Sequence, residues 1–131
     1  MIFKHGLAVI RDGKLLLVKK KGVDLLITPG GKPEKGENNI ECIEREIMEE
    51  LGTKIEMESI ELFGTFEDVT AESGNETVRI EMYLGRIKGN PKPSREIEKI
   101  FWIDSKTNPS KLSPIVRNRI LPALIREGYV K

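Results

Sequence analysis

Short hydrophobic runs alternate with polar breaks over the first thirty residues, and the breaks fall at turn-forming residues. Residues 3–11 are apolar and β-prone, and the Asp12-Gly13 pair that follows is a typical hairpin turn. Residues 14–20 carry four consecutive aliphatic side chains and are the expected partner strand. A third short strand is predicted over residues 25–27, because a proline soon follows and cannot continue a strand ladder.

The hydrophobic pattern changes to a helical period over residues 39–51. Apolar side chains recur there at three- and four-residue intervals, which places them on one face of a helix. These residues are Ile40, Ile43, Ile47 and Leu51. Asn38 or Asn39 is the expected N-cap and Gly52 the expected C-cap. The pattern therefore predicts one amphipathic helix in the middle of the chain.

The rest of the chain returns to a strand pattern before a last helix. The expected strands are residues 55–66, 77–88 and 99–103. Residues 67–76 form the expected turn between the first two of them. Ser113-Pro114 opens a final helix, which Pro122 is expected to bend. Strands around a mid-chain helix predict an α/β fold with a mixed sheet.

Length and composition narrow the class of protein. The chain has 131 residues, enough for a single domain expected to span residues 1–131. Its hydrophobic fraction of 38% and charged fraction of 33% are typical of a soluble globular protein and exclude a disordered one. No apolar run approaches the ~18 residues of a membrane span. The N-terminus shows no basic-then-apolar leader, so a cytoplasmic location is expected.

The charge balance and the two scarce residue types limit the chemistry. The net charge of +1 argues against a protein that coats nucleic acid. Cys42 and His5 are the single cysteine and histidine, which excludes an internal disulfide and a zinc site built on cysteines. Residues 32–61 nevertheless hold ten glutamates against four basic residues. A metal ion bound here would depend on carboxylates.

Three of those glutamates share one side of the predicted helix. Glu46, Glu49 and Glu50 lie at positions i, i+3 and i+4, about a quarter-turn from the isoleucine face. Like charges at that spacing cost a helix roughly 0.2–0.5 kcal/mol per pair. A cluster of oxygen ligands suits a hard cation such as Mg²⁺ or Mn²⁺. A solvent-facing glutamate-rich surface is the alternative interpretation.

The loop before the helix favours the metal-site interpretation. Gly30 and Gly31 allow a backbone to approach a ligand without a side chain in the way. A loop that leads into a helix N-terminus also presents free N–H groups to anions. An anion cradle beside a carboxylate cluster indicates a substrate that carries both phosphate and metal.

The spacing of these residues resembles the Nudix box, G-x5-E-x7-R-E-U-x-E-E-x-G-U, where U is apolar. Every fixed position of the box is matched over 22 residues, and a pattern of that length is highly specific. The matching residues are Gly31, Glu37, Arg45, Glu46, Ile47, Glu49, Glu50 and Gly52. The one departure is Thr53 at the last apolar position, where packing rather than chemistry is at stake. The resemblance implies an α/β/α sandwich around a mixed sheet.

The resemblance also implies roles for the matched residues. Glu46, Glu49 and Glu50 correspond to the metal-binding carboxylates of the family, and the carbonyl of Gly30 to a further ligand. Arg45 corresponds to the arginine that orients these glutamates. Glu37 corresponds to a glutamate that supports the loop or reaches the metal through water.

Candidates outside the box follow from the same resemblance and from residue type. The family often uses a further carboxylate from another loop; Glu96, six residues before Trp102, is the first candidate and Glu98 the second, against an ordinary exposed glutamate as the alternative. Arg79 is a candidate for phosphate binding. Phe66 is a candidate for stacking on a nucleobase.

The implied activity is metal-dependent hydrolysis of a nucleoside diphosphate linked to another group. The side motifs typical of ADP-ribose, dinucleoside polyphosphate and coenzyme A hydrolases are missing from the corresponding zones, so the chain most resembles the small nucleoside-triphosphate pyrophosphohydrolases. Oxidised nucleotides are included among the expected substrates. An ADP-ribose or other conjugate pyrophosphatase is the alternative, and a non-catalytic nucleotide sensor the further one. The expected partner is a small nucleotide, with no nucleic acid or membrane, for a monomer or homodimer.

Overall fold

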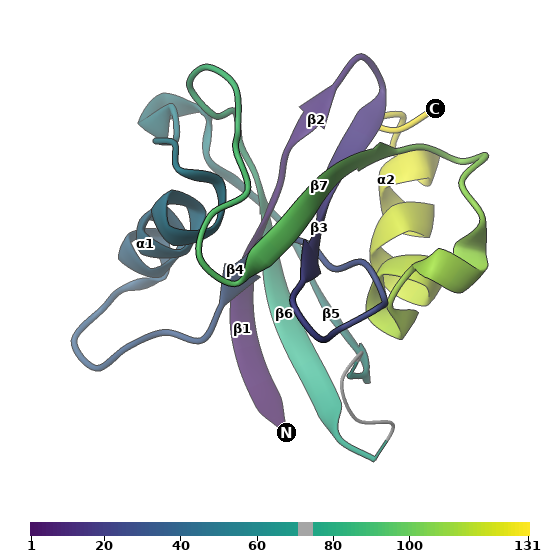
Figure 1. The fold of residues 1–131 in the computed structure, drawn as a ribbon, viewed down its shortest axis with the longest axis horizontal. Helices are drawn as coiled ribbons and strands as arrows, with labels where there is room; N and C mark the ends of the chain where they lie inside the picture. Colours follow the sequence, from purple (N-terminus) through teal and green to yellow (C-terminus); the bar gives the residue numbers. More distant parts are fainter. Residues whose placement is uncertain (71–74) are drawn as a thin grey trace.

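A computed structural model describes residues 1–70 and 75–131 of the chain (Figure 1). Its regular elements, in chain order, are β1 (Ile2–Ala8), β2 (Ile10–Arg11), β3 (Lys14–Lys20), β4 (Gly30–Gly31), α1 (Asn39–Leu51), η1 (Met57–Ser59), β5 (Glu61–Val69), β6 (Thr77–Leu84), β7 (Ile97–Ile103), η2 (Pro109–Lys111), η3 (Val116–Ile120) and α2 (Leu121–Arg126). Within the described residues, no helix combines the length and apolar character that a bilayer crossing needs.

The strands form two sheets, and the N-terminal part of the chain contributes strands to both. One sheet has the order β4-β1-β6-β5 and the other β2-β3-β7. The pairing of β1 with β6 is parallel, whereas β4 and β5 are antiparallel to their neighbours, so the larger sheet is mixed. The strand expected over residues 3–11 is thus two strands, because the chain passes from one sheet to the other at Val9.

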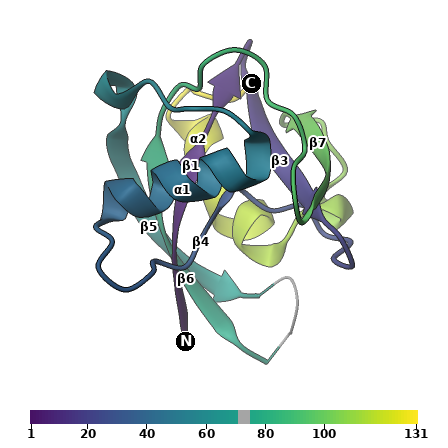
Figure 2. The same cartoon turned by 60° about the vertical axis from the view of Figure 1, so that its left-hand side comes forward.

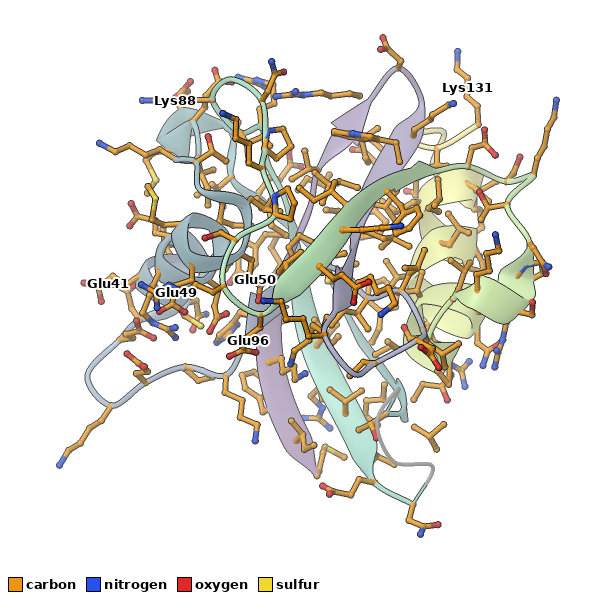
Figure 3. All side chains as sticks on the ribbon, viewed as in Figure 1. Glu41, Glu49, Glu50, Lys88, Glu96 and Lys131 are labelled. Atoms are coloured by element: carbon orange, nitrogen blue, oxygen red, sulfur yellow. The ribbon has the colours of Figure 1, made fainter. Side chains whose placement is uncertain are left out.

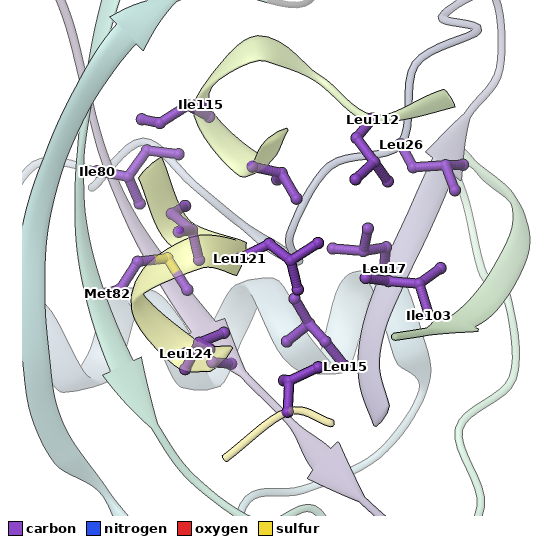
Figure 4. Packing of buried hydrophobic residues seen from close by; sticks show 14 of the residues in the cluster. Leu15, Leu17, Leu26, Ile80, Met82, Ile103, Leu112, Ile115, Leu121 and Leu124 are labelled. Carbon is purple, nitrogen blue, oxygen red and sulfur yellow. The ribbon is translucent and has the colours of Figure 1, made fainter. Parts of the chain in front are cut away.

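The two helices cover opposite faces of the strands, with α1 in front and α2 behind in Figure 2. Strand β3 shows why: Leu15 and Leu17 pack into the cluster around α2, while Leu16 and Val18 pack into the cluster around α1. Because successive side chains of a strand point to opposite faces, a strand with four consecutive apolar positions must be covered on both. Figure 4 shows the cluster around α2. The predicted α/β/α sandwich is confirmed.

Several predicted boundaries need correction. Leu26 and Ile27 form only isolated bridges, to Leu112 and Val18, and not the strand expected over residues 25–27. Ile55 likewise forms one bridge with Ile87, so the strands expected over 55–66 and 77–88 are shorter at these ends. The short helix η1 occupies the intervening chain.

The turn and the strands around it also differ from the prediction. Strand β5 continues to Val69, into the turn expected over residues 67–76, and residues 71–74 of that turn lie outside the described chain. The last strand, β7, begins at Ile97, two residues before its expected start.

The final helix begins after Ser113, as predicted, but changes type along its length. Residues 116–120 form the π-helix η3, and α2 follows from Leu121. Pro122 has no N–H to donate to the preceding turn, so the regular i→i−4 ladder cannot run through this position. The bend expected at Pro122 therefore corresponds to the junction between the π-helix η3 and α2.

Candidate active site

Helix α1 presents the carboxylates because its ends and its buried face are strongly determined. The side chain of Asn38 accepts a hydrogen bond from the N–H of Glu41, and the Glu41 side chain accepts one from the N–H of Asn38. Gly52 ends the helix in the left-handed conformation, with φ of 64°. The buried face then holds α1 on the sheet through Cys42, Ile43, Ile47 and Leu51.

Glu46, Glu49 and Glu50 line a cavity of about 550 Å³. We call it the carboxylate cavity. Figure 3 shows Glu49 and Glu50 on the side of α1 that faces Glu96, which lines the same cavity. The side of α1 that carries the three glutamates therefore faces the cavity rather than the core or open solvent.

Strand β4 places Gly30 and Gly31 next to these carboxylates. Gly31 pairs with His5 and Gly30 with Gly6 of β1. A Cβ atom at Gly31 would lie 2.5 Å from the carboxylate carbon of Glu46, and one at Gly30 would overlap the carbonyl oxygen of His5. Gly30 needs glycine because its φ is 144° and the backbone of β1 occupies the space of a side chain, whereas a side chain at Gly31 would displace the Glu46 carboxylate.

Arg45 connects the loop to two of the three carboxylates. Its Nε and Nη2 donate to the two oxygens of Glu37, at 2.6 and 3.0 Å. Its Nη1 lies 2.8 Å from Glu46 and 3.3 Å from Glu49. The hydrogen bond from Arg45, with a second from the N–H of Glu34, holds the pKa of Glu37 below its ordinary value. Arg45 therefore fixes the carboxylates relative to the glycine loop.

Glu50 is half-buried beside the glycine pair. One of its oxygens accepts a hydrogen bond of 3.1 Å from the N–H of Gly30. Burial, followed by a hydrogen bond to Glu46, raises the pKa of Glu50 to about 9. Two carboxylates this close cannot both carry a charge without a cation or a shared proton between them.

The donor groups of the three glutamates and the glycine pair fit a hard divalent cation. The available groups are carboxylate oxygens and the backbone oxygens of β4, which are the ligand types that Mg²⁺ and Mn²⁺ prefer. Within residues 1–70 and 75–131, no group of three or more Asp, Glu, His or Cys side chains is arranged so that it could hold a metal ion. The ion pairs of Arg45 with Glu46 and Glu49 use carboxylate oxygens that such a group would need.

Cationic side chains that the sequence analysis did not select also line the carboxylate cavity. They are Lys4, Lys20, Lys32 and Arg95. The neighbour of Lys20, Lys19, points elsewhere and donates to Glu98 at 3.1 Å. A register shift in the β3–β7 pairing falls between these two lysines, and a bulge of this kind re-aims side chains in a way that no sequence pattern reveals.

The two candidate glutamates of the β7 region are separated by the fold. Glu96 lines the carboxylate cavity, largely exposed, with one oxygen 3.7 Å from Nζ of Lys20. Glu98 does not line that cavity and is bound to Lys19. The geometry thus favours Glu96 as the residue that can reach a substrate.

Part of the lining of the carboxylate cavity is apolar. Its aliphatic side chains are Ile2, Ile27, Val78, Ile80 and Ile115. Ser113 lines the cavity too, with a buried hydroxyl that has no hydrogen-bond partner among the described residues. A ligand in the cavity would therefore meet both charged and aliphatic groups.

Arg79 and Phe66 do not line the carboxylate cavity. Arg79 forms an ion pair of 2.5 Å with Glu67 across the β5–β6 ladder. Phe66 stacks on Phe63, with 5.9 Å between ring centroids. The structure brings neither of these residues to the carboxylates.

Thr53, the departure from the box pattern, has a structural explanation. Its side chain is buried, and its hydroxyl donates to the carbonyl of Lys88. The position therefore packs as an apolar residue would and adds one bond to the chain after β6.

Comparison with known proteins places this site in a family. The NUDIX domain family matches residues 5–124 of the chain. A MutT NUDIX hydrolase from Burkholderia pseudomallei is 25% identical and superimposes with a TM-score of 0.71, over 97% of each chain. A MutT protein from Bacillus halodurans is 23% identical with a TM-score of 0.68, over 92% of this chain and 82% of that one.

A third similar structure is a bifunctional NMN adenylyltransferase/ADP ribose pyrophosphatase from Francisella tularensis, complexed with AMP and a manganese ion. It is 20% identical, with a TM-score of 0.68, over 96% of this chain and 41% of that one. No functionally curated protein matches the chain significantly. The chain belongs to the Nudix family. Within it, the chain is a MutT-like pyrophosphohydrolase, an enzyme that acts on phosphoric anhydrides.

Proposed function

We propose that the enzyme hydrolyses nucleoside triphosphates, oxidised ones included, to the monophosphate and pyrophosphate. The observation that carries this proposal is the carboxylate cavity, whose lining combines carboxylates, cationic side chains and aliphatic side chains. A polyphosphate chain with its metal matches the charged groups, and the faces of a base match the aliphatic ones.

Glu46, Glu49, Glu50 and the carbonyl of Gly30 are the groups that we propose to hold Mg²⁺ or Mn²⁺. When bound, the cation would neutralise charge on the phosphate oxygens. Arg45 would keep Glu46 and Glu49 in place, since it already binds both. Glu37 would in turn hold Arg45 through its paired hydrogen bonds.

Glu96 is the group that we propose to accept a proton from the attacking water. It lines the cavity from the turn just before β7 and is exposed enough to reach a water molecule there. Water attacks a phosphorus atom, the phosphoric anhydride bond breaks, and pyrophosphate leaves with the bond electrons.

A substrate panel tests the proposal. We expect turnover of a nucleoside triphosphate, with monophosphate and pyrophosphate as products, in Mg²⁺ or Mn²⁺ and none in excess chelator. The panel would also hold oxidised triphosphates, ADP-ribose, dinucleoside polyphosphates and sugar nucleotides. Preference for ADP-ribose, on which the Francisella neighbour is named to act, would overturn the substrate class. Nucleotide binding without any turnover would point to a sensor.

Glu50→Gln tests the proposed metal site. The amide keeps the size of the side chain but removes a negative oxygen, so we expect turnover to fall by about a hundredfold or more. Glu44→Gln is the matched control, because Glu44 is an exposed glutamate of the same helix that does not line the cavity. Equal activities of the two variants, both folded, would remove Glu50 from the site.

A further inference from the structure

Arg95 is held in a backbone conformation that its side chain disfavours. Its φ of 52° lies in the left-handed region, which among the described non-glycine residues is shared by Asp12 in the hairpin turn. Arg95 and Glu96 form a turn just before β7, closed by a hydrogen bond of 3.0 Å from the N–H of Ile97 to the carbonyl of Ser94. This turn explains the backbone conformation of Arg95.

The loop that carries Arg95 is attached to the end of the helix that carries the carboxylates. The N–H of Lys92 donates to the carbonyl of Leu51 at 2.9 Å, and the N–H of Ser94 to that of Glu50 at 3.1 Å. The last carbonyls of a helix have no partner within it, so these bonds satisfy them. On the other side, the carbonyl of Glu96 accepts from Lys21 at 2.8 Å. Arg95 thus has a defined position relative to the carboxylates.

The side chain of Arg95 shares Glu49 with Arg45. Nη1 of Arg95 lies 3.4 Å from one oxygen of Glu49, and Nη1 of Arg45 lies 3.3 Å from the other. The two arginines differ in how firmly they are held. Arg45 is 21% exposed and also binds Glu37 and Glu46, whereas Arg95 is 69% exposed and, in the described chain, has its recorded contact with Glu49 alone.

We propose that Arg95 is the exchangeable cation of the site and a phosphate-binding residue of the reaction. A divalent cation on Glu49 competes with the guanidinium for the same carboxylate. The displaced guanidinium remains in the carboxylate cavity, where the phosphate oxygens of the substrate are its next partner. A guanidinium matches phosphate with two parallel hydrogen bonds. This inference rests on the proposed function, since it names a group that recognises the same substrate.

The proposal predicts opposite effects of Arg95→Ala on the metal and on the substrate. Without nucleotide, titration calorimetry with Mn²⁺ should show about two- to tenfold tighter binding, because the variant loses a competing positive charge. In the hydrolysis assay, KM for the nucleoside triphosphate should rise about tenfold or more, because the variant loses a charged phosphate contact. A residue that merely stabilises the loop would not change the two affinities in opposite directions.

Three further variants separate charge from backbone effects. Arg95→Gly should show the same Mn²⁺ affinity and the same KM as Arg95→Ala. It should also keep or raise Tm, because glycine accepts the left-handed conformation. Arg95→Lys should fall between the wild type and Arg95→Ala. Arg86→Ala is the control, since Arg86 is an exposed arginine paired with Glu56 outside the cavity. It should change neither affinity.

Two results would overturn the proposal: an unchanged KM in Arg95→Ala, or Mn²⁺ binding that weakens. A wild type without turnover would overturn the proposed function alone. The Arg95 proposal would then be decided by Mn²⁺ affinity and by calorimetry with inorganic triphosphate, which the wild type should bind more tightly than Arg95→Ala.

Discussion

At the scale of single residues, the site depends on how like charges are held together. Three carboxylates on one side of a helix repel one another, and the repulsion increases as water is excluded. Arg45 offsets it by binding Glu46 and Glu49, and it can do so because Glu37 fixes its guanidinium from the loop. Among the described residues, Glu50 has no arginine in its recorded contacts, and burial raises its pKa.

The raised pKa of Glu50 predicts how stability depends on pH when no divalent cation is present. The group takes up a proton near pH 4.5 when unfolded and near pH 9 when folded. Between these values the folded state binds more protons, so the free energy of unfolding falls as pH rises. We expect Tm in chelator to drop by at least about 5 °C from pH 5 to pH 9. Thermal unfolding followed by circular dichroism would measure this drop.

Two variants calibrate that experiment. Glu50→Gln cannot titrate, so its Tm should vary less over this pH range than that of the wild type. Glu44→Gln keeps Glu50 and should follow the wild type. A wild-type profile as flat as that of Glu50→Gln would show that Glu50 is ionised throughout.

At the scale of elements, α1 is the unit that positions the chemistry. Its buried face faces the sheet, its start is capped by Asn38, and its last carbonyls bind the loop of Arg95. The glycine pair of β4 precedes it and is paired to β1. A displacement of this helix along its axis would therefore move the carboxylates, the loop and the arginines together.

Asn38→Ala tests the helix start. The variant loses the acceptor for the N–H of Glu41, so the free energy of unfolding should fall by about 1 kcal/mol in a urea titration. Asn38→Asp keeps an acceptor and should lose much less. Asn90→Ala, at an exposed loop position, is the control and should be neutral. An unchanged stability in Asn38→Ala would mean that the cap adds nothing to the folded state.

At the scale of the whole molecule, the strands form a middle layer that is buried on both faces. Leu16 and Leu17 are adjacent in β3 and both fully buried, yet they belong to different clusters. The lining of the carboxylate cavity comes from both faces. Its carboxylates come from α1, and Ile80 and Ile115 belong to the cluster around α2.

The three-layer arrangement predicts equal sensitivity at neighbouring positions. Leu16→Ala and Leu17→Ala should each lower the free energy of unfolding by about 2–5 kcal/mol, because each leaves a cavity in a packed layer. Lys14→Ala, at an exposed position of the same strand, should change it by less than about 0.5 kcal/mol. Urea unfolding would compare the three. Tolerance of either leucine substitution would contradict a strand that is covered on both faces.

The sequence by itself determined the features that depend on neighbours along the chain. The helix over residues 39–51 and its end at Gly52 follow from side-chain period and capping chemistry, which act within a few residues, and the same chemistry limited the N-cap to Asn38 or Asn39. The same locality places Glu46, Glu49 and Glu50 on one side of the helix, since helix geometry alone sets that spacing. The donor chemistry of the proposed metal site could be predicted for this reason.

Only the tertiary structure decided which distant residues join those carboxylates. The crossing between sheets at Val9 and the bulge beside Lys20 depend on strand pairing, and pairing is set by contacts between segments far apart in the chain. The same contacts place Arg95 at Glu49 and keep Arg79 and Phe66 away from the cavity. A side chain's residue type states what it can bind, but the register of its strand and the attachment of its loop decide where it points.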